Sequence, residues 1–210
     1  MEMKDRLDTI VQRWNLLEHP FYRAWRAGQL PLESLQSYAS EYGSLVRALP
    51  VGWGTVGADE TVREEWEHVK LWDSFASALD TSVGEPVNPQ TIELVGACDR
   101  LFAEPDTALG ALYAFEAQQP ETSASKLQGL RLHYKLSAAS ETYFDAHIGE
   151  TRETQDLLSR LNILGEEGQE RALAACESMC LHLWNALEGL IQHKPVIVRP
   201  PEKVHLAGAI

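Results

Sequence analysis

The segment TALGALYAFEAQQ, residues 107–119, decides the fold. The i, i+3, i+4, i+7 positions of one helical stripe are occupied by Leu109, Leu112, Tyr113 and Glu116. Because the rest of this stripe is leucine and tyrosine, we expect it to face a core and to carry the Glu116 carboxylate inward. A charge facing the core costs several kcal/mol unless it is paired, neutralised or bound to a metal. The segment therefore predicts a buried helix with a site at Glu116.

Two other segments turn ionisable groups inward in the same way, Glu65-Trp-Glu-His68 and His147-Ile-Gly-Glu150-Thr-Arg-Glu153. Glu65 and His68 are three residues apart, so they project from the same side of a helix. A Glu-x-x-His pair joined by glutamates of neighbouring helices is a recurrent way to build a di-iron or di-manganese site. Carboxylate oxygens hold such ions, and imidazole adds a neutral donor. The predicted metal ligands are Glu65, His68, Glu116, His147, Glu150 and Glu153.

Each candidate also has an ordinary structural interpretation. A single inward histidine is more often a hydrogen-bonded core residue than a ligand, and Glu150 with Glu153 fits a solvated acidic face. The number of candidates on separate helices is what favours a metal site.

Composition narrows the classes of partner. The chain has 210 residues, 44% of them hydrophobic, and a net charge of −13, so it can bury a substantial core as one domain. The acidic balance argues against nucleic acid and against anionic membranes, and no apolar run is long enough to span a bilayer. The start MEMKDRLDTI lacks the apolar stretch of a signal peptide. With Cys98, Cys176 and Cys180 interpreted as reduced thiols, we expect a cytoplasmic protein.

Helical periodicity dominates the whole chain, and no window alternates as a strand does. The sequence therefore predicts an all-α domain over 1–193, followed by an extended or disordered tail over 194–210. The glycine-rich stretch from Pro50 to Gly57 is interpreted as a connector with Trp53 anchored in the core. The predicted helices, in chain order, are Lys4–Leu17, Pro31–Leu49, one capped by Asp59 and running to Leu79, one capped by Asn88, Thr107–Gln119, Glu121–Lys135, Ala138–Ile148, Glu150–Leu164 and Glu166–Gln192.

Several motifs resemble one known family. His19-Pro-Phe-Tyr-Arg-Ala-Trp and the Gly-Gln-Leu-Pro restart resemble the beginning of the TenA/PqqC group. Ala111-Leu-Tyr-Ala-Phe-Glu116-Ala-Gln and Tyr143-Phe-Asp-Ala-His147 are similar to its CADD-like branch. The resemblance implies a haem-oxygenase-like bundle of about seven to eight helices with a non-haem iron centre, either di-iron or iron–manganese, that activates O2. It implies an oxidoreductase that acts on a small molecule, and in this branch the formation of 4-aminobenzoate for folate synthesis.

The resemblance also assigns roles to individual residues. It implies that His68, Glu116 and His147 are metal ligands and that Glu65 matches the Glu-x-x-His spacing of related members. The family's next ligands, an Asp and a His, would fall at Thr151 and Thr154, and this chain offers Glu150 and Glu153 instead.

In this branch a tyrosine of the protein supplies the aromatic ring of the product, and a lysine takes part in the amination. Tyr22 matches the sacrificed tyrosine, Lys126 the lysine, and Tyr38 a further tyrosine of the site.

Two alternatives remain at the level of sequence. The same fold supports a TenA-like hydrolase of thiamine fragments, which uses a cysteine nucleophile and no metal. A binding protein with a decayed metal site would instead pair Glu116 with a cation such as Lys126 or Arg131. Analogy with the fold further implies a homodimer.

Overall fold

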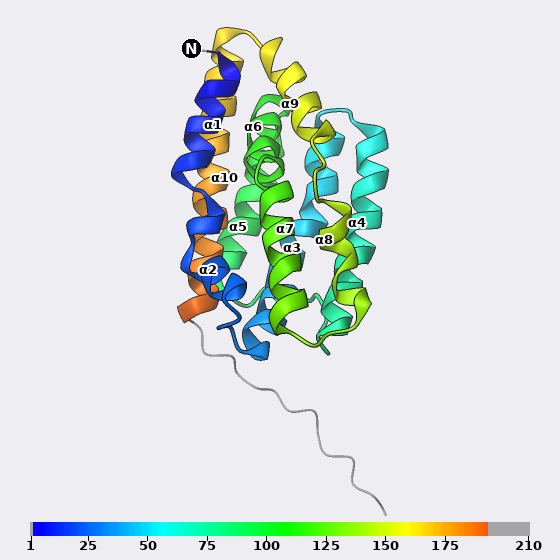
Figure 1. The fold of residues 1–210 in the computed structure, drawn as a ribbon. Coiled ribbons are helices and arrows are strands. Elements are labelled where there is room, and N and C mark those ends of the chain that lie inside the picture. The colour runs from blue at the N-terminus through cyan, green and yellow to red at the C-terminus, as the bar shows by residue number, and fades with distance from the viewer. Residues whose placement is uncertain (1, 193–210) are drawn as a thin grey trace, which may run out of the picture.

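The computed structural model describes residues 2–192, which form an all-α bundle (Figure 1). Within these described residues there are ten α-helices and two 3-10 helices, and eight of the α-helices have eleven residues or more. The elements are α1 (Met3–Arg13), η1 (Leu16–Glu18), α2 (Pro20–Arg26), α3 (Leu32–Thr55), α4 (Asp59–Ala78), α5 (Pro89–Leu101), α6 (Pro105–Glu116), α7 (Gln119–His133), η2 (Ala138–Ser140), α8 (Thr142–Ala146), α9 (Arg152–Asn162) and α10 (Glu166–Gln192). The predicted tail over 194–210 lies outside the described residues.

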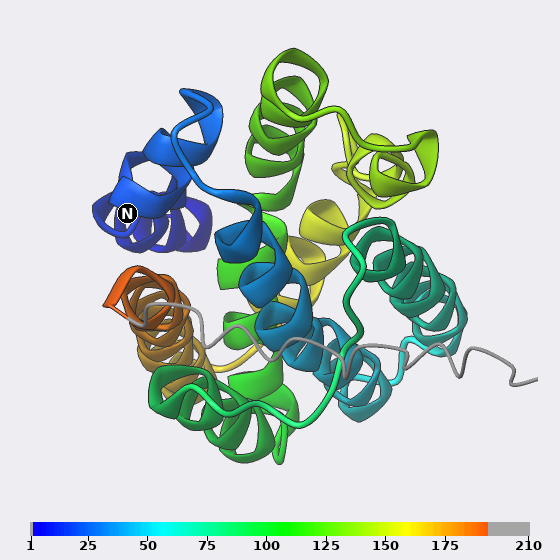
Figure 2. The same cartoon turned by 90° about the horizontal axis from the view of Figure 1, so that it is seen from below.

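Two helices run through the middle of the bundle. Seen from below, α3 lies inside a ring formed by the other helices, with α1, α2 and α10 on one side and α4 and α8 on the other (Figure 2). α6 packs against α10, α9 and α3, and α3 packs against α4 and α5. A side chain on the inner face of α6 is therefore surrounded by helices, as the stripe around Glu116 predicts.

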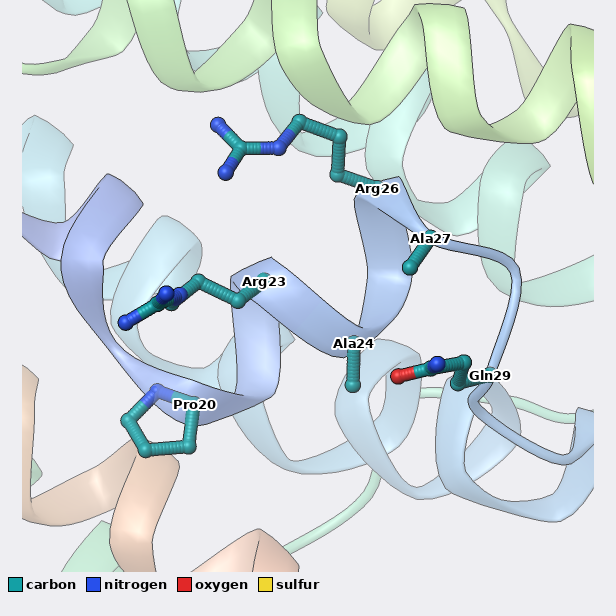
Figure 3. Close-up of a pocket in the computed structure, with 6 residues that line it drawn as sticks. All are labelled: Pro20, Arg23, Ala24, Arg26, Ala27 and Gln29. Carbon is teal, nitrogen blue, oxygen red and sulfur yellow. The ribbon is translucent and has the colours of Figure 1, made fainter.

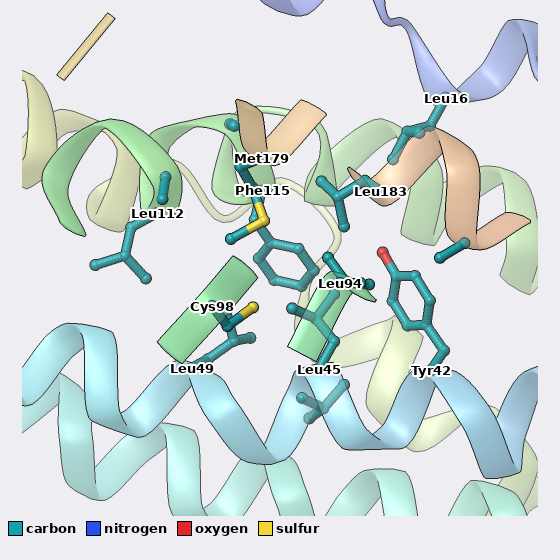
Figure 4. Packing of buried hydrophobic residues seen from close by; sticks show 14 of the residues in the cluster. Leu16, Tyr42, Leu45, Leu49, Leu94, Cys98, Leu112, Phe115, Met179 and Leu183 are labelled. Carbon is teal, nitrogen blue, oxygen red and sulfur yellow. The ribbon is translucent and has the colours of Figure 1, made fainter. Parts of the chain in front are cut away.

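α6 and α10 approach each other closely at Gly110 on α6. A Cβ atom there would lie 1.9 Å from the carbonyl oxygen of Ala172 on α10, so only glycine fits. Apolar side chains fill the space between α3, α5, α6 and α10 (Figure 4). Leu45, Leu94 and Phe115 are among the buried residues of this core. The interior is therefore closely packed beside the segment that carries Glu116.

The predicted connector after Leu49 is wrong, because α3 continues through Pro50 to Thr55. Proline inside a helix removes one backbone hydrogen bond. Here the apolar stripe of α3 carries on beyond it, since Leu49 and Trp53 are four residues apart and both are buried. Gly52 leaves room for the Phe102 ring, which would lie 2.9 Å from a Cβ atom at that position. Burial thus outweighs the local preference of the sequence, and Trp53 is anchored in the core as predicted.

Other boundaries also differ from the predicted ones. The first helix ends at Arg13 instead of Leu17, and the Asn15 side chain accepts a hydrogen bond from Leu17 N to start η1. The predicted helix 138–148 is broken into η2 and the five-residue α8. Gly149, at φ 74°, ends that segment, so α9 begins at Arg152 rather than at residue 150.

The predicted cap at Asn88 is confirmed, whereas Asp59 is the first helical residue and Ala58 takes the cap position. No helix within residues 2–192 combines the length and apolarity needed to cross a bilayer.

Candidate metal centre

Three glutamates from three helices meet inside the bundle. Glu65 lies on α4, Glu116 at the end of α6 and Glu153 in the first turn of α9. One carboxylate oxygen of each lies within 4.8 Å of the others. Their exposed fractions are 2%, 3% and 6%, so water has little access to the group. Three like charges at this distance in a buried place need a cation or protons to be stable.

The pKa values of two of these carboxyl groups are raised, as this crowding predicts. Burial, together with the charges of Glu153 and Glu65, raises the pKa of Glu116 well above its usual value. Burial and the charge of Glu65 also raise the pKa of Glu153 to about 7. The Trp53 indole opposes the shift at Glu116. The group therefore holds protons at neutral pH, and it would exchange them for a metal ion.

Two imidazoles lie beside the carboxylates. Nδ1 of His68 is 3.5 Å from Oε1 of Glu65, and the rings of His68 and His147 have centroids 4.3 Å apart. Nδ1 of His147 lies 2.6 Å from the Tyr143 carbonyl oxygen, which can only accept, so Nδ1 donates and Nε2 keeps its lone pair. Burial lowers the pKa of His147 to about 4, so this imidazole is neutral. A neutral imidazole fixed by a backbone carbonyl is the usual form of a metal-binding histidine.

The residues present fit a metal ion. Oε1 of Glu116 and Nδ1 of His68 are buried without a hydrogen-bond partner, although such atoms are normally paired. Three carboxylates and two imidazoles form a donor set suited to iron or manganese. The arrangement brings Glu65, Glu116 and Glu153 to one point, with His68 beside Glu65 and His147 beside His68, and the role of each as a ligand stays a prediction.

Glu150 is the predicted ligand that the fold does not bring into this group. Its Oε1 accepts a hydrogen bond of 2.6 Å from the backbone N–H of Arg152, at the first residue of α9. Glu150 therefore satisfies the start of the helix from which Glu153 projects. Its possible role as a ligand stays a prediction.

A lysine and two tyrosines form a second buried group. Lys126 on α7 is 3% exposed, and its Nζ lies 3.3 Å from the hydroxyl of Tyr38. The hydroxyls of Tyr38 and Tyr22 are 2.9 Å apart, and Lys126 Nζ lies 4.9 Å from the centre of the Tyr22 ring. Burial lowers the pKa of Lys126 to about 7. Burial, with the Tyr38 phenol beside it, raises the pKa of Tyr22 well above its usual value.

Aromatic residues fill the space between the two groups. Burial, together with Tyr22 and the charge of Glu116, raises the pKa of Tyr42 well above its usual value. Burial, with the charges of Glu65 and Glu116, raises the pKa of Tyr143 well above its usual value. The Tyr143 hydroxyl accepts a hydrogen bond of 3.0 Å from Gln119 Nε2. Sequence reasoning gave neither tyrosine a function. The signal for Tyr42 was its position one turn after Tyr38 on the same inward stripe.

The three cysteines are poorly placed to act as nucleophiles. Cys98, Cys176 and Cys180 are buried, and burial raises the pKa of Cys98 to about 12. A protonated, buried thiol is a poor nucleophile, so the TenA-like hydrolase has little support.

An open pocket of about 520 Å³ lies on the outer side of α2 (Figure 3) and is lined by Pro20, Arg23, Ala24, Arg26, Ala27 and Gln29.

Comparison with known proteins identifies the family. Residues 53–152 match a family of proteins described as iron-containing redox enzymes. A 4-aminobenzoate synthase of Nitrosomonas europaea is 32% identical, over 89% of this chain and 90% of the relative. The chain belongs to the 4-aminobenzoate synthase family. A second member, from Chlamydia pneumoniae, is 29% identical over 88% of this chain and 93% of its own length.

Membership of the 4-aminobenzoate synthase family confirms three predictions from the sequence, namely the CADD-like resemblance, an enzyme of the redox class, and iron as the metal. The predicted fold is confirmed as well. A Shewanella denitrificans domain described as having a haem-oxygenase-like fold superimposes with a TM-score of 0.74 at 15% identity, covering 91% of this chain and 92% of that domain.

Proposed function

We propose that this chain forms 4-aminobenzoate from its own Tyr22, with Lys126 in the amination, at an iron centre held by Glu65, His68, Glu116, His147 and Glu153. The observation that carries this proposal is the line of contacts from Lys126 through Tyr38 to Tyr22 in the same closed interior as the three carboxylates. Relatives named 4-aminobenzoate synthase support the product.

The chemistry divides between the two groups. Bound iron supplies the redox chemistry that activates O2. The tyrosine side chain contains all the carbon atoms of 4-aminobenzoate, because its ring and Cβ carry substituents in the same para relation as the amino and carboxylate groups of the product. Replacing the phenolic oxygen with nitrogen and oxidising Cβ, with cleavage from Cα, therefore converts one into the other.

The residues around Tyr22 are suited to this conversion. With a pKa near 7, a large share of Lys126 is a neutral amine with a free electron pair at physiological pH. The short contact between Tyr22 and Tyr38 and the contact of Tyr38 with Lys126 form a path along which a phenolic proton reaches the amine. The buried rings of Phe21, Trp25 and Tyr38 beside Tyr22 help to exclude water from reactive species.

Isotope labelling tests this proposal directly. Protein made with tyrosine labelled in its ring and Cβ is loaded with Fe(II), with and without Mn(II), and given O2 and a reductant. We expect labelled 4-aminobenzoate by mass spectrometry and the loss of the corresponding mass at Tyr22. Lysine labelled at its side-chain nitrogen shows whether Lys126 donates that atom.

Two variants make the result decisive. Tyr22→Phe should bind iron and release no product, whereas Tyr134→Phe should behave as the parent, because the Tyr134 hydroxyl bonds only to the Leu30 carbonyl at the periphery. Unlabelled product, or product from Tyr22→Phe, would exclude the self-sacrificing reaction. The homodimer and the cytoplasmic location stay predictions, the first to be checked by light scattering.

A further inference from the structure

The position of Glu153 depends on the first turn of α9. α9 begins at Arg152, one residue before Glu153, and follows a loop in which Gly149 has a positive φ of 74°. A Cβ atom at Gly149 would meet no atom within 4 Å, so no packing surrounds the loop at that glycine. A carboxylate so close to a helix end needs polar contacts to hold its direction.

Such contacts come from the residues next to two of the proposed ligands. The guanidinium of Arg152 bonds to the carboxylate of Glu64, the residue before Glu65 on α4. Nη2 of Arg152 is also 3.9 Å from Oε1 of Glu153. The Arg152 backbone N–H bonds to Glu150. Arg152 therefore links the start of α9 to α4, and both partners of this link are next in sequence to a proposed ligand.

We propose that Glu64 and Arg152 are positioning residues that hold Glu153 at the metal centre. The inference rests on the proposed metal-binding role of Glu153. Arg152 and Glu64 have exposed fractions of 54% and 37%, and an ion pair this exposed contributes little to the stability of the fold. Its effect is therefore expected in metal binding, where outer contacts that orient a ligand matter more than they do for folding.

A simple effect of charge predicts a different pattern. If Arg152 acted only as a nearby positive charge, removing it would tighten the binding of a cation, and removing Glu64 would weaken it. If the pair positions Glu153, removing either residue weakens binding, and removing both adds little, because both act through one contact.

The experiment is a double-mutant cycle on metal affinity. Glu64→Ala, Arg152→Ala and the double variant are compared with the parent by chelator competition, using Fe(II) or Mn(II) without oxygen. Glu67→Ala is the matched control, because Glu67 pairs with Lys70 at 2.6 Å on the exposed side of the same helix. Melting temperatures of the metal-free proteins are measured in parallel.

We expect each single variant to bind about fivefold more weakly, the double variant no more weakly than the singles, and Arg152→Lys to recover part of the loss. Glu67→Ala and the metal-free melting temperatures should stay unchanged. Tighter binding by Arg152→Ala, or additive losses, would overturn the positioning role.

The two proposals fail differently. A parent protein that binds iron and releases 4-aminobenzoate, with unaltered affinity in all variants, removes only the positioning role. A parent that binds no metal overturns both.

Discussion

The two buried groups of this protein, one acidic and one basic, do not pair with each other in the part of the chain that the structure describes. Glu65, Glu116 and Glu153 face one another without a lysine among them, while the hydrogen-bond and cation–π partners of Lys126 within residues 2–192 are Tyr38, Tyr22 and Phe144. Burial raises the pKa of Glu116 and lowers that of Lys126, so each group sheds its charge through protons instead of a salt bridge.

Keeping the groups apart leaves each one available for chemistry. The carboxylates can take a metal ion, and the amine can act as a nucleophile. A decayed site would have paired Glu116 with Lys126 or Arg131, and Arg131 instead bonds to Glu141 at the surface. The separation favours an intact enzyme over a binding protein.

The largest effect is expected from breaking the acidic group. Glu116→Gln should reduce metal affinity by at least about 100-fold and raise the stability of the metal-free protein by about 1 kcal/mol, because a crowded carboxylate is removed. Metal content after reconstitution and chemical unfolding measure the two effects.

Glu41→Gln is the matched control. Glu41 is also buried, but it accepts hydrogen bonds from the N–H groups of Val87 and Asn88. Its variant should lose stability and keep the metal. Equal metal loss in both variants would contradict the role of Glu116.

Removing the amine of the basic group should affect product formation and leave metal binding unchanged. Lys126→Met should abolish 4-aminobenzoate formation, leave metal binding intact and raise stability by a few kcal/mol at neutral pH. Since the folded pKa of Lys126, about 7, lies below its unfolded value of 10.5, the penalty is complete below pH 7 and fades as pH rises toward 10.5.

The gain of Lys126→Met over the parent should therefore shrink across that range. Unfolding in urea at several pH values measures it, with the exposed Lys70→Met as control. A gain independent of pH would mean that Lys126 is not a buried, neutral amine.

The response to pH should distinguish the acidic group from the basic one in the parent protein. A carboxyl group whose pKa is higher in the folded than in the unfolded protein stabilises the fold while it is protonated. For Glu153 this stabilisation is complete below the unfolded pKa of 4.5 and is lost as the pH rises through the folded pKa of about 7. Metal ions replace those protons, so the rise in melting temperature on adding Fe(II) should be larger at pH 8 than at pH 6.

Thermal unfolding without oxygen checks this, with Glu116→Gln as the variant in which the response should be lost. A rise that is equal at both pH values would show that protons and metal do not compete for these carboxylates.

The smallest effect is expected at the link between the groups. Gln119→Leu leaves the Tyr143 hydroxyl without its donor, which should cost about 1 kcal/mol and lower product yield. Gln36→Leu removes a bond to the Leu79 carbonyl, which belongs to neither buried group, so it should cost similar stability and leave the yield unchanged. Equal yields in the two variants would remove any role for Gln119 in the reaction.

The sequence predicted the inward direction of side chains that lie on regular helical stripes. Glu116 and the Glu65–His68 pair follow periodicity within long helices, so their inward direction could be predicted. Glu150 and Glu153 could not be distinguished, because the break at Gly149 resets which residue faces the core. Nor could local rules foresee that α3 passes through Pro50, since the packing of Leu49 and Trp53 decides it.

The contact of Gly110 with the Ala172 carbonyl has a consequence for the family's chemistry. It sets how far α6 can slide along α10, and Glu116 lies six residues, or about 9 Å, further along the same rigid rod. The position of Glu116, the proposed metal ligand, therefore depends on the contact between these two backbones. A Gly110→Ala substitution would therefore displace α6 and move the Glu116 carboxylate, although residue 110 does not touch the proposed metal centre.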